Sequence, residues 1–307
     1  MKRIKKLLSV FKSAGSGFVE DNAFKLSASL SYYTLFALGP LFIIIISLVA
    51  IFFGRPAVEG RIYYELNDLI GSQAAMQIQE IIKNIQQSHS STTGALIGAA
   101  ILIVGATGVF TEMQDSINYI WSVKAKPKKS WKKFLVNRAL SFSLVVTLGF
   151  LLLVSLIISA LLNVLSSQIL EWFPKVPLNL FQWLSTAISF VVITSLFMVI
   201  FKVLPDAIIS WRDAAVGAIV TALLFLVGKS LINLYLTRSN LGLTYGAAAS
   251  VVILLSWVYY SALILYFGAE FTKMYALKAG GGLRPKQTAV FIIKRESREV
   301  PSAHVET

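Results

Sequence analysis

The sequence contains no cysteine and only two histidines, His89 and His304. Disulfide bonds and thiolate metal sites are therefore excluded, and metal binding through imidazole is not expected. Charged residues are also scarce: they make up 14% of the 307 residues, whereas hydrophobic residues make up 56%. A soluble core of this length could not bury so much apolar surface, and so few charges could not cover its outside. The low content of charged residues and the high content of hydrophobic residues therefore predict a membrane protein.

Acidic residues are few as well, with 15 Asp and Glu against 28 Lys and Arg, so the formal net charge is +13. In a soluble protein this excess would suggest nucleic acid as a partner, because lysine and arginine neutralise phosphates. Here the basic residues gather in three blocks, at 2–25, 124–138 and 273–298, which long apolar runs separate. That distribution is typical of topology signals and of contacts to anionic lipid headgroups, so no specific nucleic acid is expected.

Long apolar runs supply the fold class. A helix that spans a bilayer needs about 20 mostly apolar residues. The sequence predicts an all-α polytopic membrane protein with six spans, at about 26–53, 93–110, 139–165, 180–204, 214–236 and 247–271. The basic blocks alternate with basic-poor loops, which places both termini in the cytoplasm. The first apolar run is longer than the core of a signal peptide and no cleavage pattern follows it, so we expect it to stay in the protein.

Amphipathic segments flank the spans. In residues 1–25, apolar side chains recur at helical spacing with lysines opposite, which predicts a basic helix lying on an anionic leaflet as a cytoplasmic anchor. A second apolar stripe, in the outer loop at about 73–87, predicts either an interfacial helix or a lid over a cavity. Residues 26–275 then form the membrane domain, and residues 276–307 are predicted to be a cytoplasmic tail that is mobile after Gly280.

Several phrases resemble the YihY/BrkB family of bacterial inner-membrane proteins, once labelled ribonuclease BN. They are LSASLSYYTLFALGP at 26–40, VFTEMQDSINYIW at 109–121, LP at 204–205 followed by WRDAAVG at 211–217, and GAE at 268–270. One departure is Gly39, where the family pattern leads us to expect a bulkier residue before the proline. The resemblance extends over about 21–274. It implies a six-span protein of the bacterial plasma membrane, with associations to virulence, envelope integrity and lipid or solute export.

The nuclease label does not suit this chain. Metal-dependent hydrolysis of RNA needs clustered His and Asp ligands that hold metal ions and activate water. The sequence has no His-x-His pair, no neighbouring histidines and no soluble catalytic domain. It also lacks a G-x-x-x-x-G-K-[ST] nucleotide-binding loop. We therefore expect no enzymatic activity, no metal and no cofactor.

Lys229 is the only charged residue well inside a predicted span, and Asn233 follows one turn later on the same face. Ionisable groups inside a bilayer are costly unless they are paired or hydrated, so each is a candidate functional residue. This strip predicts a cavity that receives an anionic headgroup. Alternatively, the lysine extends to the outer interface while small residues nearby pack helices together.

Gly39 and Pro40 fall near the middle of the first predicted span. Proline removes a backbone donor and clashes with the preceding turn, so this pair predicts a kink or break. The inner half of the span is polar and includes Tyr32 and Tyr33. Broken helices line substrate pathways in transporters, which makes these four residues pathway candidates. A kink that serves only packing would leave the same pattern.

Two carboxylates near the second span are candidates for gating or coupling. Glu112 and Asp115 share one face of the helix that continues from that span. Carboxylates at this spacing could perform acid/base chemistry. They also precede the basic block at 124–138, so they could equally be its electrostatic partners.

Four further charged residues have the same double interpretation. Asp206, Arg212 and Asp213 lie in the short turn between the fourth and fifth spans, which is either a cytoplasmic gate or a capped turn. Glu270 ends the sixth span beside Lys273, where it is either a proton-coupling carboxylate or half of an ion pair at the membrane edge.

The sequence therefore favours a transporter-like protein that moves an anionic or amphipathic, lipid-derived substrate in envelope maintenance. The alternative is a non-transporting scaffold for envelope assembly. Expected partners are membrane lipids, above all anionic headgroups, and envelope proteins. A hydrated cleft lined by Tyr32, Tyr33 and Lys229 would favour transport, whereas a closed, dry bundle would favour the scaffold.

Overall fold

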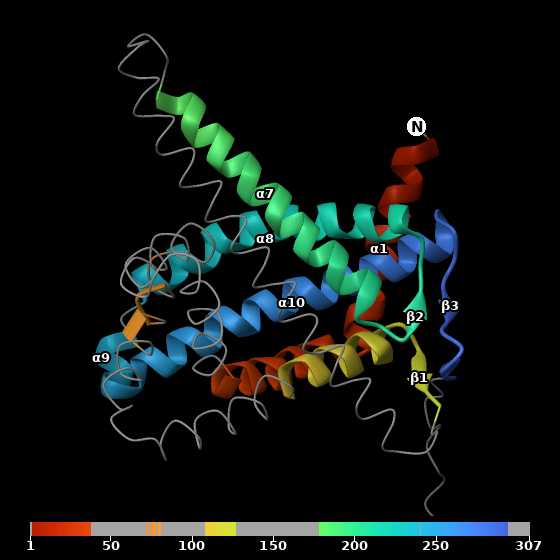
Figure 1. The fold of residues 1–307 in the computed structure, drawn as a ribbon. Coiled ribbons are helices and arrows are strands. Elements are labelled where there is room, and N and C mark those ends of the chain that lie inside the picture. The colour runs from red at the N-terminus through yellow and green to blue at the C-terminus, as the bar shows by residue number, and fades with distance from the viewer. Residues whose placement is uncertain are drawn as a thin grey trace, which may run out of the picture.

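A computed structural model describes residues 2–37, 72, 75–77, 79–80, 108–126, 178–239 and 241–293, and these are mostly helical (Figure 1). The long labelled helices are α1 (Lys2–Glu20), α7 (Leu178–Val203), α8 (Trp211–Arg238) and α10 (Ala249–Lys278). Residues 23–37 and 108–120 are helical too. A short helix α9 (Leu241–Tyr245) and the 3-10 turn η1 (Gly246–Ala248) lie between α8 and α10.

Three of the described helices are long and apolar enough to cross a membrane, over Thr186–Val203, Trp211–Arg238 and Val251–Lys278. They coincide with the fourth, fifth and sixth predicted spans. The sixth helix differs in its end, because α10 continues past residue 271 to Lys278. The predicted ranges 38–53, 93–107 and 139–165 lie outside the described residues, as does most of the outer-loop segment at 73–87, whose described positions are helical.

Small residues bring α8 and α10 into close antiparallel contact. Gly217 of α8 lies against Thr272 of α10, and Gly268 of α10 lies in the same way against Thr221 of α8. A Cβ added at either glycine would meet the opposing threonine at distances that real Cβ atoms essentially never show. Each threonine hydroxyl donates to a carbonyl of its own helix, Thr221 to Gly217 and Thr272 to Gly268, so burial leaves neither hydroxyl unsatisfied. Close approach through small residues is how helices associate in lipid.

The opposite face of α8 exposes an apolar stripe. Its members recur one turn apart and are 42–61% exposed: Ile219, Leu223, Val227, Leu231 and Tyr235. Soluble proteins rarely leave so long a row of large apolar side chains uncovered. The stripe is the surface that a membrane-spanning helix presents to lipid.

Helix α1 packs along the carboxyl-terminal half of α10. Val10 and Ala14 are fully buried with Phe271, and the ring centroid of Phe11 lies 4.7 Å from that of Phe271. The chain then turns sharply at Asn22, which has a positive φ of 52°. Asparagine tolerates this left-handed conformation better than most residues. The corner separates α1 from the helical residues 23–37, so the predicted anchor at 1–25 is a helix followed by a bend.

The fold departs from the all-α prediction in four short strands at one end of the bundle. Strand β1 (Val123–Ala125) pairs antiparallel with β4 (Ala289–Phe291), and β2 (Ala207–Ile208) pairs antiparallel with β3 (Arg284–Pro285). Strands β1, β2 and β3 are all labelled at the right-hand edge of Figure 1, with β2 beside β3 and β1 below them. The sequence predicts a mobile tail after Gly280. In the structure this segment instead contains strands β3 and β4, which pair with other parts of the chain.

We call residues 283–292 the strap, because this segment runs across two loops that are distant in sequence. Beyond the strand pairs, Lys286 N donates to Asp206 O at 2.9 Å and Ile292 N donates to Ser122 O at 2.8 Å. Leu283 and Ala289 of the strap are buried in the main core. The strap thus joins the end of helix 108–120 to the turn between α7 and α8.

Candidate functional site

A cluster of buried charges lies where α1, the helix 108–120 and α10 meet. Lys273 Nζ lies 3.1 Å from Glu270 Oε1 and 3.5 Å from Asp21 Oδ2. Glu270 has no solvent exposure and Asp21 is 5% exposed. The two carboxyl groups also lie within hydrogen-bonding reach of each other. One ammonium group therefore serves two carboxyl groups in an almost dry site.

Neighbouring backbone groups fix the geometry of this cluster. Lys273 Nζ also donates to Ile120 O at 2.6 Å, which holds it at the end of the helix 108–120. Trp121, which is almost fully buried, donates its indole N–H to Ala269 O at 3.0 Å. Gly17 of α1 lies directly over Glu270, so closely that a Cβ on residue 17 would come within 2.6 Å of Oε1. The cluster is thus enclosed from three sides.

Within the part of the chain that the structure describes, the hydrogen bonds of Glu270 are incomplete. Among the described residues, no group donates to its buried Oε2 atom. A buried carboxylate oxygen without a donor is costly, because desolvation is not repaid. With both acids ionised the three side chains carry one net negative charge, and one added proton makes them neutral. The arrangement is therefore suited to gaining and losing a proton.

The predicted gate residues in the turn between α7 and α8 have structural partners. Asn118 donates through Nδ2 to Asp206 Oδ2 at 3.1 Å and accepts from Asp206 N at 2.7 Å. Asp213 is 3% exposed and accepts from Gly281 N at 2.9 Å. Ser210 caps α8 by accepting from Asp213 N. This turn is therefore fixed to two other parts of the chain, which matches the capping interpretation of these acids.

Basic side chains complete the same turn. Lys286 of the strap donates to Val203 O at 3.2 Å, and burial lowers its pKa, although the charge of Asp206 acts in the opposite direction. Lys202 donates to Ile209 O and lies over the Trp211 ring, 5.3 Å from its centroid. Arg212, the remaining gate candidate, is exposed at the start of α8.

The pathway candidates are on separate elements. Tyr32 and Tyr33 are exposed on the helical segment 23–37, with ring centroids 6.1 Å apart. Lys229 and Asn233 are half-buried near the carboxyl end of α8. Gly39 and Pro40 lie outside the described residues, so a break in the first span stays a prediction.

Small residues near Lys229 serve helix packing. Gly228 lies against Tyr260 and Ile264 of α10, where an added Cβ would come within 2.7 Å of both side chains. The side of the predicted polar strip that includes Gly228 is thus part of the contact between α8 and α10. That result agrees with the packing alternative for the small residues of α8.

Glu112 and Asp115 lie on helix 108–120, where Glu112 is half-buried and Asp115 exposed. Sequence reasoning missed Asp21, because a charged residue at the end of a basic amphipathic helix normally faces water. The signal that could have found it is the neighbouring Asn22, whose tolerance of a left-handed turn allows the chain to bend there. No three His, Asp or Glu side chains gather into a metal site within the described ranges.

Comparisons with known proteins identify relatives. The family model described as virulence factor BrkB matches residues 14–291. UPF0761 membrane proteins of Psychromonas ingrahamii and Saccharophagus degradans are each 30% identical to the chain, over 82% and 84% of its length. The match covers 82% of the Psychromonas protein. It covers only 58% of the Saccharophagus protein and 59% of a relative in Halorhodospira halophila, so the chain spans less than two thirds of the length of these two relatives. No solved structure matches significantly. On its family match and its apolar helices, this chain belongs to the virulence factor BrkB family of membrane proteins.

Proposed function

We propose that this chain is a transporter-like protein of the bacterial inner membrane, which moves an anionic, lipid-derived amphiphile and exchanges a proton at Glu270. The observation that carries the proposal is the buried Glu270 carboxyl group. Among the described residues, its one cationic partner is Lys273, which it shares with Asp21, and no group donates to its Oε2 atom. Ionisable groups on membrane-spanning helices typically mark ion pathways and proton relays. No nucleotide-binding loop is present, so a gradient or a partner would supply the energy.

Proton exchange at this position would affect helix packing. Glu270 belongs to α10, Asp21 follows α1, and Lys273 also contacts the end of helix 108–120. Adding a proton to the acids would weaken their attraction for Lys273 and would allow the carboxyl groups to bond to each other. Because Gly17 lies against Oε1, a shift of the Glu270 side chain would change the fit of α1 on α10. A differential contact of this kind is what links ion binding to conformational change.

The substrate class follows from charge. The family relatives are membrane proteins, and the described helix α1 presents Lys6 and Lys12 to solvent beside exposed Leu7, Leu8 and Phe11. A basic amphipathic helix binds anionic lipid surfaces. An anionic amphiphile is therefore the substrate that this surface would collect.

The test uses the purified full chain in liposomes that contain a pH-sensitive dye, with fluorescently labelled phosphatidylglycerol as the probe and labelled phosphatidylcholine as the neutral comparison. We expect the protein to accelerate movement of phosphatidylglycerol between leaflets and to carry protons with it. Glu270→Gln should abolish the dependence on a pH gradient. Glu20→Gln, which changes an exposed acid of α1, should behave as the wild type.

The rival function is a non-transporting scaffold for envelope assembly. The complete burial of Glu270 favours this alternative, because a dry ion cluster also suits a static joint between helices. If the liposomes show neither lipid movement nor proton flux, and Glu270→Gln only lowers thermal stability, the transport proposal is wrong and the scaffold is the better description.

A further inference from the structure

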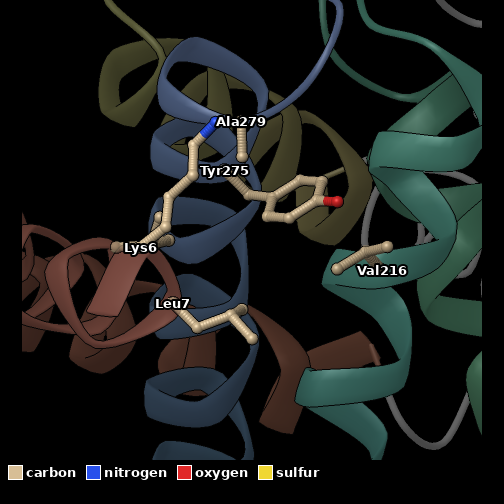
Figure 2. A pocket seen from close by; sticks show the side chains of 6 residues that line it. Lys6, Leu7, Val216, Tyr275 and Ala279 are labelled. Carbon is tan, nitrogen blue, oxygen red and sulfur yellow. The ribbon is translucent and has the colours of Figure 1, made fainter. Parts of the chain in front are cut away.

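A cavity of about 440 Å³ lies between α1, α8 and α10, in a region that the sequence did not identify. Its lining residues are Lys6, Leu7, Val10, Val216, Tyr275 and Ala279. Figure 2 shows Lys6 extending along α10 toward Ala279, while the Tyr275 ring points toward Val216 of α8. The volume lies within the range of about 300–1,000 Å³ that is typical of small-molecule sites.

We infer that this cavity binds the headgroup of an anionic phospholipid from the adjoining leaflet. The inference deepens the proposed function, because it names a site for the amphiphile, and it rests on that proposal only for the claim that the bound lipid is transported. Among the described lining residues, Lys6 supplies the only charged side chain, and the Tyr275 hydroxyl supplies a neutral donor. The remaining lining side chains are apolar. One cation above apolar walls complements a phosphate that is joined to acyl chains.

We expect the cavity to lie at the level of the lipid headgroups, because it is at one end of two candidate spans. Val216 is in the second turn of α8, whereas Tyr275 and Ala279 are at the carboxyl end of α10. Because the two helices are antiparallel, these ends lie together, and the cavity is at one end of both candidate spans. Leu7 is 42% exposed and its neighbour Leu8 is 64% exposed, which extends the apolar wall outward along α1. Such a surface lies in the interface of a membrane, with acyl chains beneath it. A lipid could therefore enter from the side.

The helix ends around the cavity also tolerate an anion. Carbonyl groups at the end of a helix repel phosphate unless they are occupied. Here Tyr275 O accepts from the backbone N–H groups of Ala279 and Gly280, and Ala276 O accepts from Gly282 N. Asp213 accepts from Gly281 N and is not among the described residues that line the cavity. The positive end of α8 faces the same side, which favours a negative ligand.

Binding is measured with the full chain in a neutral detergent, by titration with phosphatidylglycerol and, separately, with phosphatidylcholine. We expect preference for phosphatidylglycerol that decreases at high salt. Lys6→Ala should weaken phosphatidylglycerol binding by about tenfold, which corresponds to about 1.4 kcal/mol. Lys12→Ala is the comparison variant, because it removes one lysine from the exposed surface of the same helix outside the cavity lining, so it should weaken binding much less than Lys6→Ala does.

A second variant separates the cavity from general surface charge. Val216→Trp fills the space without changing any charge, so it should reduce phosphatidylglycerol binding while size-exclusion chromatography shows a folded protein. If Lys6→Ala and Lys12→Ala weaken binding equally, the lipid binds the surface of α1 in general and the inference is overturned. It is also overturned if sodium phosphate alone displaces the lipid, since the site would then recognise free phosphate.

Failure of this inference is distinct from failure of the transport proposal. Binding in detergent involves no pH gradient, so it is measured independently of proton exchange. If the wild type binds phosphatidylglycerol but moves neither the lipid nor protons, the transport proposal fails and the cavity inference stands. Intact transport in Lys6→Ala contradicts only the cavity.

Discussion

Replacement of Gly217 by alanine provides a direct test of the contact between α8 and α10. The new Cβ would lie 2.8 Å from Thr272 Cβ and 3.0 Å from its Cγ2. Ordinary van der Waals contact begins at 3.4 Å, so the closer pair falls about 0.6 Å short. Thr272 Cβ is bonded to the α10 backbone, and no side-chain rotation moves it away. The helices themselves must separate.

The expected loss of stability follows from two opposing effects. Overpacking of this kind typically costs about 1–3 kcal/mol. Because the contact with Thr272 Cβ cannot be relieved by rotation, the cost should lie in the upper part of this range, at about 2–3 kcal/mol. Alanine recovers about 1 kcal/mol of helix propensity relative to glycine, which leaves a net loss of about 1–2 kcal/mol for Gly217→Ala. At about 2–4 °C per kcal/mol, the melting temperature in detergent should fall by several degrees. Separation of the helices would also loosen the reciprocal contact of Gly268 with Thr221.

Two further variants decide whether the contact is responsible. Gly15→Ala in α1 has no atom within 4 Å of the added Cβ, so it should keep or raise the melting temperature. The double variant Gly217→Ala with Thr272→Gly moves the small residue to the opposite helix and should recover part of the loss. If Gly217→Ala melts at or above the wild-type temperature, as Gly15→Ala should, then the proposed close approach of α8 and α10 is refuted.

Three other changes test the end of the bundle that carries the strands. Asn118→Ala removes both hydrogen bonds to Asp206 and should lower stability by about 1–3 kcal/mol in a denaturant titration. An unchanged midpoint would show that these bonds contribute nothing. Ile292→Pro removes the donor to Ser122 O and should speed tryptic cleavage within the strap, and equal cleavage rates would contradict the pairing. Burial lowers the pKa of Lys286, so the folded state releases this proton before the unfolded state does as the pH rises toward about 10.4. The wild type should therefore gain stability relative to Lys286→Met as the pH rises toward about 10.4, and parallel pH profiles would exclude this effect.

The sequence predicted the described membrane helices well, because apolar length alone determines where a helix must cross lipid. The predicted ranges 180–204 and 214–236 correspond closely to α7 and α8. The sixth span was predicted to end at about 271, and helix α10 continues beyond that position to Lys278. In the structure Lys273 is in the buried cluster, and Lys278 donates to Ser9 O and to Ser13 of α1. Both lysines therefore remain within the helix.

The sequence could not predict the strap or the full charge cluster. Strands of two or three residues are too short to show an alternating pattern. Glu270 was identified because a carboxylate in an apolar span is conspicuous, whereas Asp21 was hidden among the charges of an amphipathic segment. The lipid cavity was equally hidden, since Lys6 and Tyr275 come together only when α1 packs on α10. Such sites depend on tertiary contacts that local periodicity does not contain.

The strap has a consequence for how the protein is made. Membrane helices enter the bilayer in the order in which they are synthesised, yet β1 and β2 pair with strands that follow the last described helix. The loops after residue 120 and after α7 must therefore wait, with unpaired backbone groups, until residues 284–291 leave the ribosome. The two strand pairs at this end of the bundle can therefore form only after α10 has been synthesised. A truncated chain would hold its helices in the membrane but would lack the segment that fastens them together.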